Sequence, residues 1–349
     1  MQEDKPIHQT TWKSPSNLAI VKYWGKKDFQ EPVNPSVSFS LSRACTKTTV
    51  SLAPKEGSGF TFCLDNREEP GFRPKIQKFL DHVRARIPLI ENYHINIFST
   101  NTFPHSSGIA SSASAMSALA LCLADLQQQV SDRHYLNIRE VSSLARMGSG
   151  SAARSVYGGW SIWGRIPEIP ESSHHYAIPL PDEIHPLFKT LHDDVLIVSG
   201  QSKKVSSSAG HAMMNDHPYR EGRIIQAREN TLKLIRTLKQ GNMDDFIEVT
   251  ENEALSLHGL MMSSMPSYTL LHPNSLRIIR EISDFRDATG LPVTFSLDAG
   301  PNIHLLYPHH IEEEIIAWEQ KQLQTFCEDG RIIRDRIGSG PEKIIDTNK

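Results

Sequence analysis

Cysteine is scarce in this sequence, and its spacing does not indicate a site. Only four cysteines occur in 349 residues, and none belongs to a C-x-x-C pair, so neither a zinc site nor a disulfide framework is indicated. They are Cys45, Cys63, Cys122 and Cys327. Reduced thiols of this kind are typical of cytoplasmic proteins, and the cytoplasm is the compartment that we expect.

Long apolar runs and an excess of charge are lacking as well. No stretch reaches the ~18 apolar residues that a membrane-spanning helix needs, and residues 1–6 carry acids where a secretory signal has an apolar run. The 37 Lys and Arg residues nearly balance the 40 Asp and Glu residues, which indicates no surface for nucleic acid or membrane. A strongly acidic substrate would therefore need a locally basic pocket.

Histidine is plentiful, with 16 residues, but its spacing is not that of a metal site. His174 and His175 are adjacent, as are His309 and His310, and adjacent side chains diverge on a helix or a strand. No H-E-x-x-H motif occurs. We expect these histidines on the surface.

The order of strand-like and helix-like segments predicts an α+β protein. An apolar share of 38% and a charged share of 22% are typical of a globular chain, and its length suffices for two lobes with separate cores. Alternating patterns predict strands, first at residues 36–41, 46–52, 59–63 and 94–98, and later at 195–198, 293–297, 303–307 and 331–334. Helical patterns occur at residues 76–86, 113–123, 138–147, 220–238, 244–257, 273–289 and 311–324. This order has no regular βαβ rhythm, which argues against a Rossmann sheet.

A serine-rich loop, P-H-S-S-G-I-A-S-S-A-S at residues 104–114, lies between a predicted strand and a predicted helix. The unpaired N–H groups and positive dipole at a helix N-terminus can hold a phosphate. Gly108 lets the backbone approach the oxygens, and the hydroxyls of Ser111 and Ser112 can bond to them or reach a magnesium ion. No G-K-[ST] follows, so this is not a Walker loop. An ordinary capped helix fits the segment equally well.

Three further segments carry polar groups suited to an acidic substrate. Residues 149–155 combine hydroxyls, a glycine and Arg154, whose guanidinium can grip a carboxylate or phosphate with two hydrogen bonds. Residues 17–26 bring lysines and a tyrosine to an apolar, strand-like run, and residues 298–302 form a tight turn that begins with an acid. Each also has an ordinary interpretation, as a capped helix, a core strand and a self-capping turn.

Together these segments resemble the GHMP kinase superfamily and, within it, the diphosphomevalonate decarboxylase family. The matches occur in the family's order at residues 15–26, 101–113, 148–159, 204–210 and 298–302. The motifs K-Y-W-G-K and G-S-G-S-A-x-R-S are specific to the decarboxylases, whereas the phosphate loop is shared by the whole superfamily. The resemblance extends over residues 12–340, which is nearly the whole chain.

The resemblance implies two α+β lobes, at residues 1–187 and 188–349, with the active site in the cleft between them. The implied reaction is the ATP-dependent decarboxylation of mevalonate 5-diphosphate to isopentenyl diphosphate, ADP, phosphate and CO2, in isoprenoid biosynthesis. It implies ATP and Mg²⁺ as ligands and a homodimer, with no nucleic-acid or membrane partner. Three alternatives stay open: the same chemistry on the monophosphate, 3-phosphorylation without decarboxylation, and a non-catalytic binding protein of the same fold.

Residue roles also follow from the resemblance. The catalytic set is Asp298, which would face the tertiary hydroxyl, with Lys22 beside it, and Asn17 and Arg154 near the leaving carboxylate. The substrate-binding set is Tyr23, Lys26, Ser149, Ser151 and Arg154. The nucleotide-binding set is Pro104, Ser106, Ser107, Gly108, Ile109, Ala110, Ser111 and Ser112. Ser112 would also reach the metal, and Ser206 and Ser207 would lie over the phosphates.

Three positions depart from the family pattern. Pro35 stands where a serine is common and lacks both a hydroxyl and a backbone donor. His105 begins a His-Ser-Ser run where Thr-Ala-Ala is usual, and His211 follows a glycine where methionine is common. We expect these changes to affect substrate detail more than reaction class.

Overall fold

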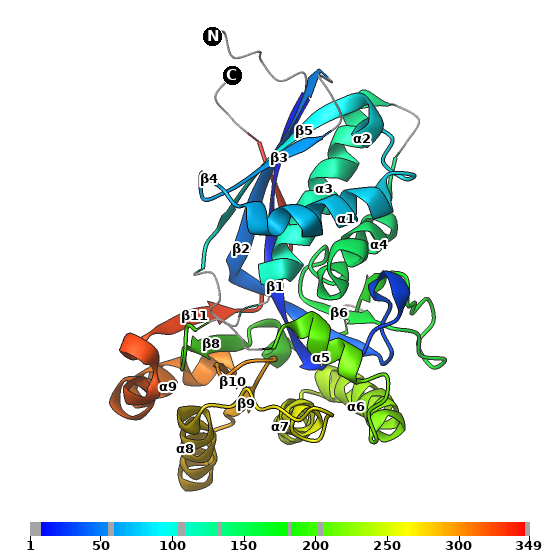
Figure 1. The fold of residues 1–349 in the computed structure, drawn as a ribbon. Coiled ribbons are helices and arrows are strands. Elements are labelled where there is room, and N and C mark those ends of the chain that lie inside the picture. Colours follow the sequence, from blue (N-terminus) through cyan, green and yellow to red (C-terminus); the bar gives the residue numbers. More distant parts are fainter. Residues whose placement is uncertain are drawn as a thin grey trace.

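The chain folds into two lobes, each built on a β-sheet with helices packed against it (Figure 1). The structure is a computed structural model and describes residues 8–54, 59–103, 109, 111–131, 135–180, 183–201 and 205–345. In these residues no helix is both long and apolar enough to cross a membrane. The predicted α+β class is confirmed.

The first lobe is built on a mixed sheet of eight strands in the described residues, with the order β12-β1-β2-β5-β3-β4, and β6 and β7 extending from β2. The strands are β1 (His8–Val21), β2 (Ser36–Pro54), β3 (Phe60–Leu64), β4 (Arg67–Glu68), β5 (Tyr93–Asn101), β6 (Trp160–Trp163), β7 (Ala177–Pro179) and β12 (Glu342–Ile344). Among the described strands of this sheet, β3 and β5 are the one parallel pair. Because β12 pairs with β1, the chain returns to the first sheet near its C-terminus.

The long strand β2 replaces two predicted strands. The predicted break near residues 42–45 is an irregularity within one strand, where the pairing with β1 shifts between Pro15 and Asn17. Such a bulge bends and twists a strand without ending it. Beyond this shift, residues 17–21 pair with residues 37–40 of β2, and β1 contacts helices of the second lobe.

Helices cover one face of the first sheet. They are α1 (Arg73–Val83), α2 (Leu89–Asn92), α3 (Ser111–Val130) and α4 (Ile138–Gly148), followed by a 3-10 turn at Gly150–Ala153. The apolar side of α3 packs on β1 and β2 and buries Leu119 and Leu123. Asn137 caps α4, since its side chain accepts from the N–H groups of Arg139 and Glu140. These helices fix where the N-terminus of α3 meets the C-terminus of α4.

The second lobe has a four-stranded antiparallel sheet in the order β11-β8-β10-β9. Its strands are β8 (His192–Leu196), β9 (Thr294–Ser296), β10 (Ile303–Tyr307) and β11 (Ile332–Arg336). Its helices are α5 (Ser207–Met213), α6 (Arg220–Gln240), α7 (Met243–Met262), α8 (Pro273–Thr289) and α9 (Glu312–Trp318). The predicted helix at 311–324 is α9 continued by a π-helical turn at Glu319–Leu323.

Buried polar residues explain why β8 begins before its predicted start. His192, Asp193 and Asp194 are all buried. Asp193 accepts a hydrogen bond from His304 at 2.8 Å, and Asp194 accepts one from the hydroxyl of Tyr307 at 2.7 Å. Because these partners come from the neighbouring strand β10, the apolar pattern of β8 alone could not reveal them.

A buried ion pair connects the second lobe to the end of β1. Arg223 on α6 donates to both carboxylate oxygens of Glu253 on α7, at 2.7 and 2.6 Å, and both side chains are buried. Glu253 also accepts from the backbone N–H of Lys22 at 2.8 Å, and Arg223 donates to the Lys22 carbonyl at 3.1 Å. The pair therefore fixes the backbone at Lys22.

Replacing Arg223 with methionine is expected to destabilise the protein by about 3–5 kcal/mol, because Glu253 would stay buried without its cation. The measurement is chemical denaturation followed by circular dichroism. Arg236→Met, at an exposed position on the same helix, is the matched control. Equal midpoints for the two variants would show that the pair does not stabilise the fold.

Candidate active site

A cavity of about 770 Å³ opens between the two lobes. Its lining comes from the end of β1, the N-termini of α1 and α3, the turn after α4, the helix α5, and residues 298–299. It brings together the predicted residues Asn17, Lys22, Tyr23, Lys26, Ile109, Ser111, Ser112, Ser149, Ser151, Arg154, Ser206, Ser207 and Asp298. Pro104, Ser106, Ser107, Gly108 and Ala110, as well as His105, lie outside the described residues.

An aspartate–lysine pair lies at the bottom of this cavity. Lys22 is 2% exposed, and its Nζ lies 3.2 Å from Oδ1 of Asp298 and donates to Oγ of Ser296 at 2.8 Å. Burial lowers the pKa of Lys22, and the charge of Asp298 opposes that shift. The Asp298 side chain keeps 26% of its surface exposed, so the carboxylate borders the cavity while the lysine holds it.

A buried arginine lies beside this pair. Arg154 donates from Nη1 to Oγ of Ser36 at 2.6 Å, and from Nε and Nη2 to Oδ1 of Asn17 at 3.3 and 3.2 Å. Asn17 in turn donates to Oγ of Ser155 at 2.8 Å. Burial lowers the pKa of Arg154 to about 10, so the guanidinium stays charged at neutral pH. Pro35 stands where the family commonly has a serine, but the next residue, Ser36, still supplies a hydroxyl to the site.

Hydroxyl groups gather where α3 begins and α4 ends. The Oγ atoms of Ser112 and Ser149 lie 3.2 Å apart, and those of Ser149 and Ser151 lie 3.3 Å apart. A side chain at Gly150 would not fit, since its Cβ would lie 2.7 Å from the hydroxyl oxygen of Tyr23. The cluster at the N-terminus of α3 is a suitable place for an anion.

Sequence reasoning missed two lysines of α1 that line the cavity. Lys75 and Lys78 are three residues apart, a spacing that places them on one face of a helix, and this was the available signal. Lys26 lies on the same side, and its pKa is lowered by its burial and by the charge of Lys78. The described lining thus carries five cations, Lys22, Lys26, Lys75, Lys78 and Arg154, against one acid, Asp298. Such a surplus suits a ligand with several negative charges.

The helix α5 closes one side of the cavity. Ser206 caps this helix, because its Oγ accepts from the N–H of Ala209 at 3.2 Å. Lys26 donates to Oγ of Ser208 at 3.4 Å and to Oε1 of Gln30 at 3.1 Å. Ser208 was not among the predicted residues. It follows Ser207 directly, and the serine run alone could not distinguish which hydroxyl faces the lysine.

Tyr23 lines the cavity with its ring more than with its hydroxyl. The hydroxyl donates to the carbonyl of Gln30 at 3.1 Å. The ring packs against Trp163 and His211, with centroids 4.8 and 4.4 Å away. Burial raises the pKa of Tyr23, so the phenol stays neutral.

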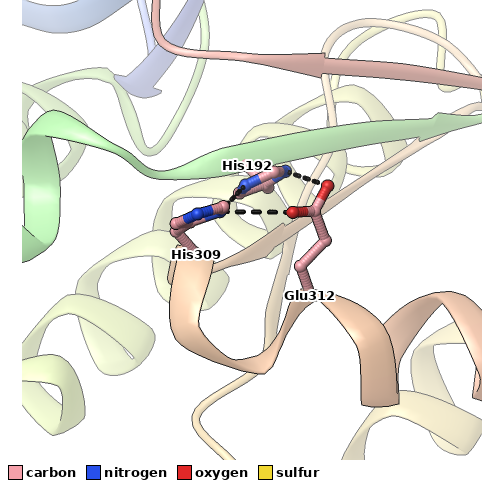
Figure 2. A group of neighbouring side chains, drawn as sticks. All are labelled: His192, His309 and Glu312. Atoms are coloured by element: carbon pink, nitrogen blue, oxygen red, sulfur yellow. Dashed lines mark hydrogen bonds and ion pairs between the residues drawn. The ribbon is translucent and has the colours of Figure 1, made fainter.

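A second cluster of titratable groups, which does not line this cavity, lies in the second lobe. His309 approaches Nε2 of His192, with 3.0 Å between the nitrogens, whereas Glu312 lies 3.6 Å from Nδ1 of His192 and 3.2 Å from Nδ1 of His309 (Figure 2). One ligand atom from each of the three side chains lies within 4.8 Å of the other two, but the three groups already contact one another directly. We interpret the cluster as a hydrogen-bonded group. His175, His309 and His310 are exposed, as predicted, whereas His174 is half-buried. The prediction of surface histidines is wrong for the buried His192, His211, His217, His258 and His304.

The sequence of this chain is similar to known proteins over nearly its whole length. Residues 14–174 match the diphosphomevalonate decarboxylase-like N-terminal domain, and residues 194–342 match the mevalonate 5-diphosphate decarboxylase C-terminal domain. The diphosphomevalonate decarboxylase of Bos taurus is 31% identical over 323 residues, which are 86% of this chain and 77% of the bovine protein. The chain belongs to the diphosphomevalonate decarboxylase family. The resemblance stated from the motifs is confirmed.

Solved structures of diphosphomevalonate decarboxylases share this fold. The enzyme from Staphylococcus aureus has a TM-score of 0.85 at 29% identity and covers 97% of this chain and 98% of its own. A structure described as MDDEF in complex with MVAPP, AMPPCP and magnesium has a TM-score of 0.81 at 26% identity and covers 96% of this chain and 98% of its own. The predicted GHMP kinase-like fold is therefore confirmed.

Proposed function

We propose that this chain catalyses the ATP-dependent decarboxylation of mevalonate 5-diphosphate to isopentenyl diphosphate, with ADP, phosphate and CO2 as the other products. The observation that carries the proposal is the Lys22–Asp298 pair at the bottom of a cavity whose described lining has five cations and one acid. The pair suits a reaction at a hydroxyl group, and the cations suit a substrate with a carboxylate and two phosphates. Family membership supports the same reaction.

The reaction needs phosphorylation because a tertiary hydroxyl is a poor leaving group. Transfer of the γ-phosphoryl group from ATP to the 3-hydroxyl converts the oxygen into part of a stable phosphate anion. Departure of this phosphate and of CO2 from neighbouring carbons then leaves the alkene. The electron pair of the breaking carbon–carboxylate bond becomes the new π bond, so no oxidant or reductant is required.

Asp298 is the residue that we propose for the hydroxyl proton. Its carboxylate borders the cavity, and the Lys22 ammonium beside it favours the ionised form. An ionised carboxylate can accept the proton or orient the hydroxyl for attack on the γ-phosphate. Because Lys22 is held by Ser296 and by the buried Arg223–Glu253 pair, the carboxylate has a fixed cationic partner.

Arg154 and Asn17 are the residues that we propose for the carboxylate that leaves. Arg154 is held on both sides by Ser36 and Asn17, so its guanidinium is fixed before the substrate arrives. Tyr23, Lys26, Ser149 and Ser151 would hold the phosphates of the substrate, and Lys75 and Lys78 join them as further cations.

The nucleotide would bind at the N-terminus of α3, where Ile109, Ser111 and Ser112 line the cavity and hydroxyls gather. Hydroxyl oxygens are suitable ligands for a hard cation, and Ser112 is the residue that we propose to reach magnesium. A bound magnesium ion would neutralise charge on the transferring phosphoryl group. Ser206 and Ser207, at the start of α5, would face the phosphates from the other side.

The overall organisation completes the proposal. We propose lobes at residues 1–187 and 188–349, with the strand β12 of the second segment joined to the first sheet. A homodimer and a cytoplasmic location remain predictions. Light scattering of the purified chain tests the dimer.

Competition between substrates tests the proposed function. We expect kcat/KM for mevalonate 5-diphosphate to exceed that for the 5-phosphate by about 10²-fold, since the second phosphate adds charge-assisted hydrogen bonds to the lysines. The assay couples ADP release to CO2 release. Comparable kcat/KM for the monophosphate would assign the chain to the monophosphate reaction, and ADP without CO2 would indicate a 3-kinase.

A further inference from the structure

His211 is a buried histidine of the cavity to which the proposed mechanism assigns no role. It lies on α5, is 8% exposed, and lines the cavity beside Tyr23 and Trp24. Its ring centroid lies 4.4 Å from that of Tyr23 and 4.6 Å from that of Trp24. The close approach depends on Gly210, where a Cβ would lie 2.6 Å from the Trp24 ring.

One nitrogen of this imidazole is committed to the backbone. Nδ1 of His211 accepts a hydrogen bond from the N–H of Gly25 at 3.0 Å. A nitrogen that accepts from a peptide N–H must carry its lone pair, so the ring proton of the neutral imidazole lies on Nε2. Burial, and secondarily the charge of Lys26, lower the pKa of His211 to about 3, so the ring keeps this neutral form at physiological pH.

The other nitrogen is therefore a fixed donor. No described residue accepts a hydrogen bond from Nε2, yet this atom is not among the buried polar atoms that lack a partner in the described residues. Nε2 therefore keeps some exposed surface, and His211 lines the cavity together with Lys26, whose charge acts on the ring. A neutral N–H donor among cations suits an anionic oxygen, because it adds a directed hydrogen bond without further repulsion between cations.

We propose that His211 is a substrate-binding residue that donates its Nε2–H to a phosphate oxygen at the Lys26 end of the cavity. This inference rests on the proposed function, since it assigns the diphosphate of the substrate to that end. His211 also connects α5 to the segment that carries Tyr23 and Lys26, through the bond from Gly25 to Nδ1. The structural contact of Nδ1 and the proposed phosphate contact of Nε2 can therefore be tested separately.

Two amide replacements separate these contacts. In His211→Asn the side-chain oxygen can take the place of Nδ1 and keep the bond from Gly25, but nothing replaces the Nε2 donor. In His211→Gln the amide nitrogen can take the place of Nε2 and keep the donor. His211→Met removes both contacts at similar volume, and His310→Gln is a control at an exposed histidine.

We expect KM for mevalonate 5-diphosphate to rise about tenfold in His211→Asn and His211→Met, with kcat and the KM for ATP nearly unchanged. His211→Gln should retain most of the wild-type KM. A wild-type KM in His211→Asn overturns the proposal. The proposal is also overturned if kcat falls while both KM values and the unfolding propensity rise together, the last seen as a lower melting temperature. Such a result indicates only a structural role.

Calorimetric titration with inorganic pyrophosphate makes the test independent of turnover. We expect the affinity of the chain for pyrophosphate to fall about tenfold in His211→Asn and to be retained in His211→Gln. If the wild type releases no CO2 from mevalonate 5-diphosphate, the proposed function fails while this titration still reports on His211. Equal affinity in wild type and His211→Asn, or no binding to the wild type, contradicts the role of His211.

Discussion

Replacing Asp298 with asparagine is expected to lower kcat for CO2 release by about 10²–10⁴-fold, the usual contribution of a positioned acid–base group. Asparagine has nearly the shape of aspartate but cannot take the hydroxyl proton, and it gives Lys22 no negative partner. The nucleotide should still bind nearly as well, because its proposed residues lie at the N-terminus of α3. Release of labelled CO2 and titration with an ATP analogue measure the two quantities.

Asp287→Asn is the matched control, since Asp287 is an exposed carboxylate of α8 on the surface of the same lobe. It should leave both quantities unchanged. If Asp298→Asn kept wild-type CO2 release, the assignment of the hydroxyl proton to this carboxylate would be wrong. If it lost nucleotide binding as well, the separation of the two sites would be wrong.

Replacing Arg154 with lysine is expected to lower kcat/KM for mevalonate 5-diphosphate by about 10²-fold, in line with the loss of hydrogen bonds to a charged group. Lysine keeps the positive charge but not the planar fork, which bonds to Ser36 and Asn17 and can still face a carboxylate. Steady-state kinetics with varied substrate at saturating ATP measure the effect.

The KM for ATP should stay near its wild-type value in Arg154→Lys, because Arg154 is proposed to bind the leaving carboxylate and not the nucleotide. Arg236→Lys, at an exposed position, is the control. A kcat/KM within about threefold of wild type would show that charge alone suffices at this position and that the bidentate geometry has no role.

Much of the fold could be predicted because its elements follow simple periodic patterns. The helix α8 was predicted at its observed bounds, and β10 was too. β8 was predicted to begin at residue 195 and not at residue 192, and β12 was not predicted. β8 begins with three buried polar residues whose partners lie on other elements of the second lobe. β12 is a short strand of mostly exposed residues that is recognisable only through its pairing with β1. Such pairings join segments that are distant in the sequence, so a local sequence pattern does not indicate them.

The site was predicted where its residues occur in dense motifs and missed where they do not. Lys22, Arg154 and Asp298 stand in motifs and lie together in the cavity. Lys75 and Lys78 belong to an ordinary amphipathic helix, and their position at the cavity depends on how α1 packs on α4. His211 was noted only as a departure from a pattern. The hydrogen bond from the Gly25 N–H to its Nδ1 joins residues that are distant in the sequence, so no local pattern indicates it.

The measurement that tests the central claim most directly is the stoichiometry of the complete reaction. The claim is that Asp298 and Lys22 direct ATP to a hydroxyl whose phosphorylation drives loss of the adjacent carboxylate. With mevalonate 5-diphosphate labelled at the carboxylate carbon, we predict one CO2 for each ADP formed, and no CO2 when ATP is omitted. ADP formed without CO2, or CO2 formed without ATP, would contradict it.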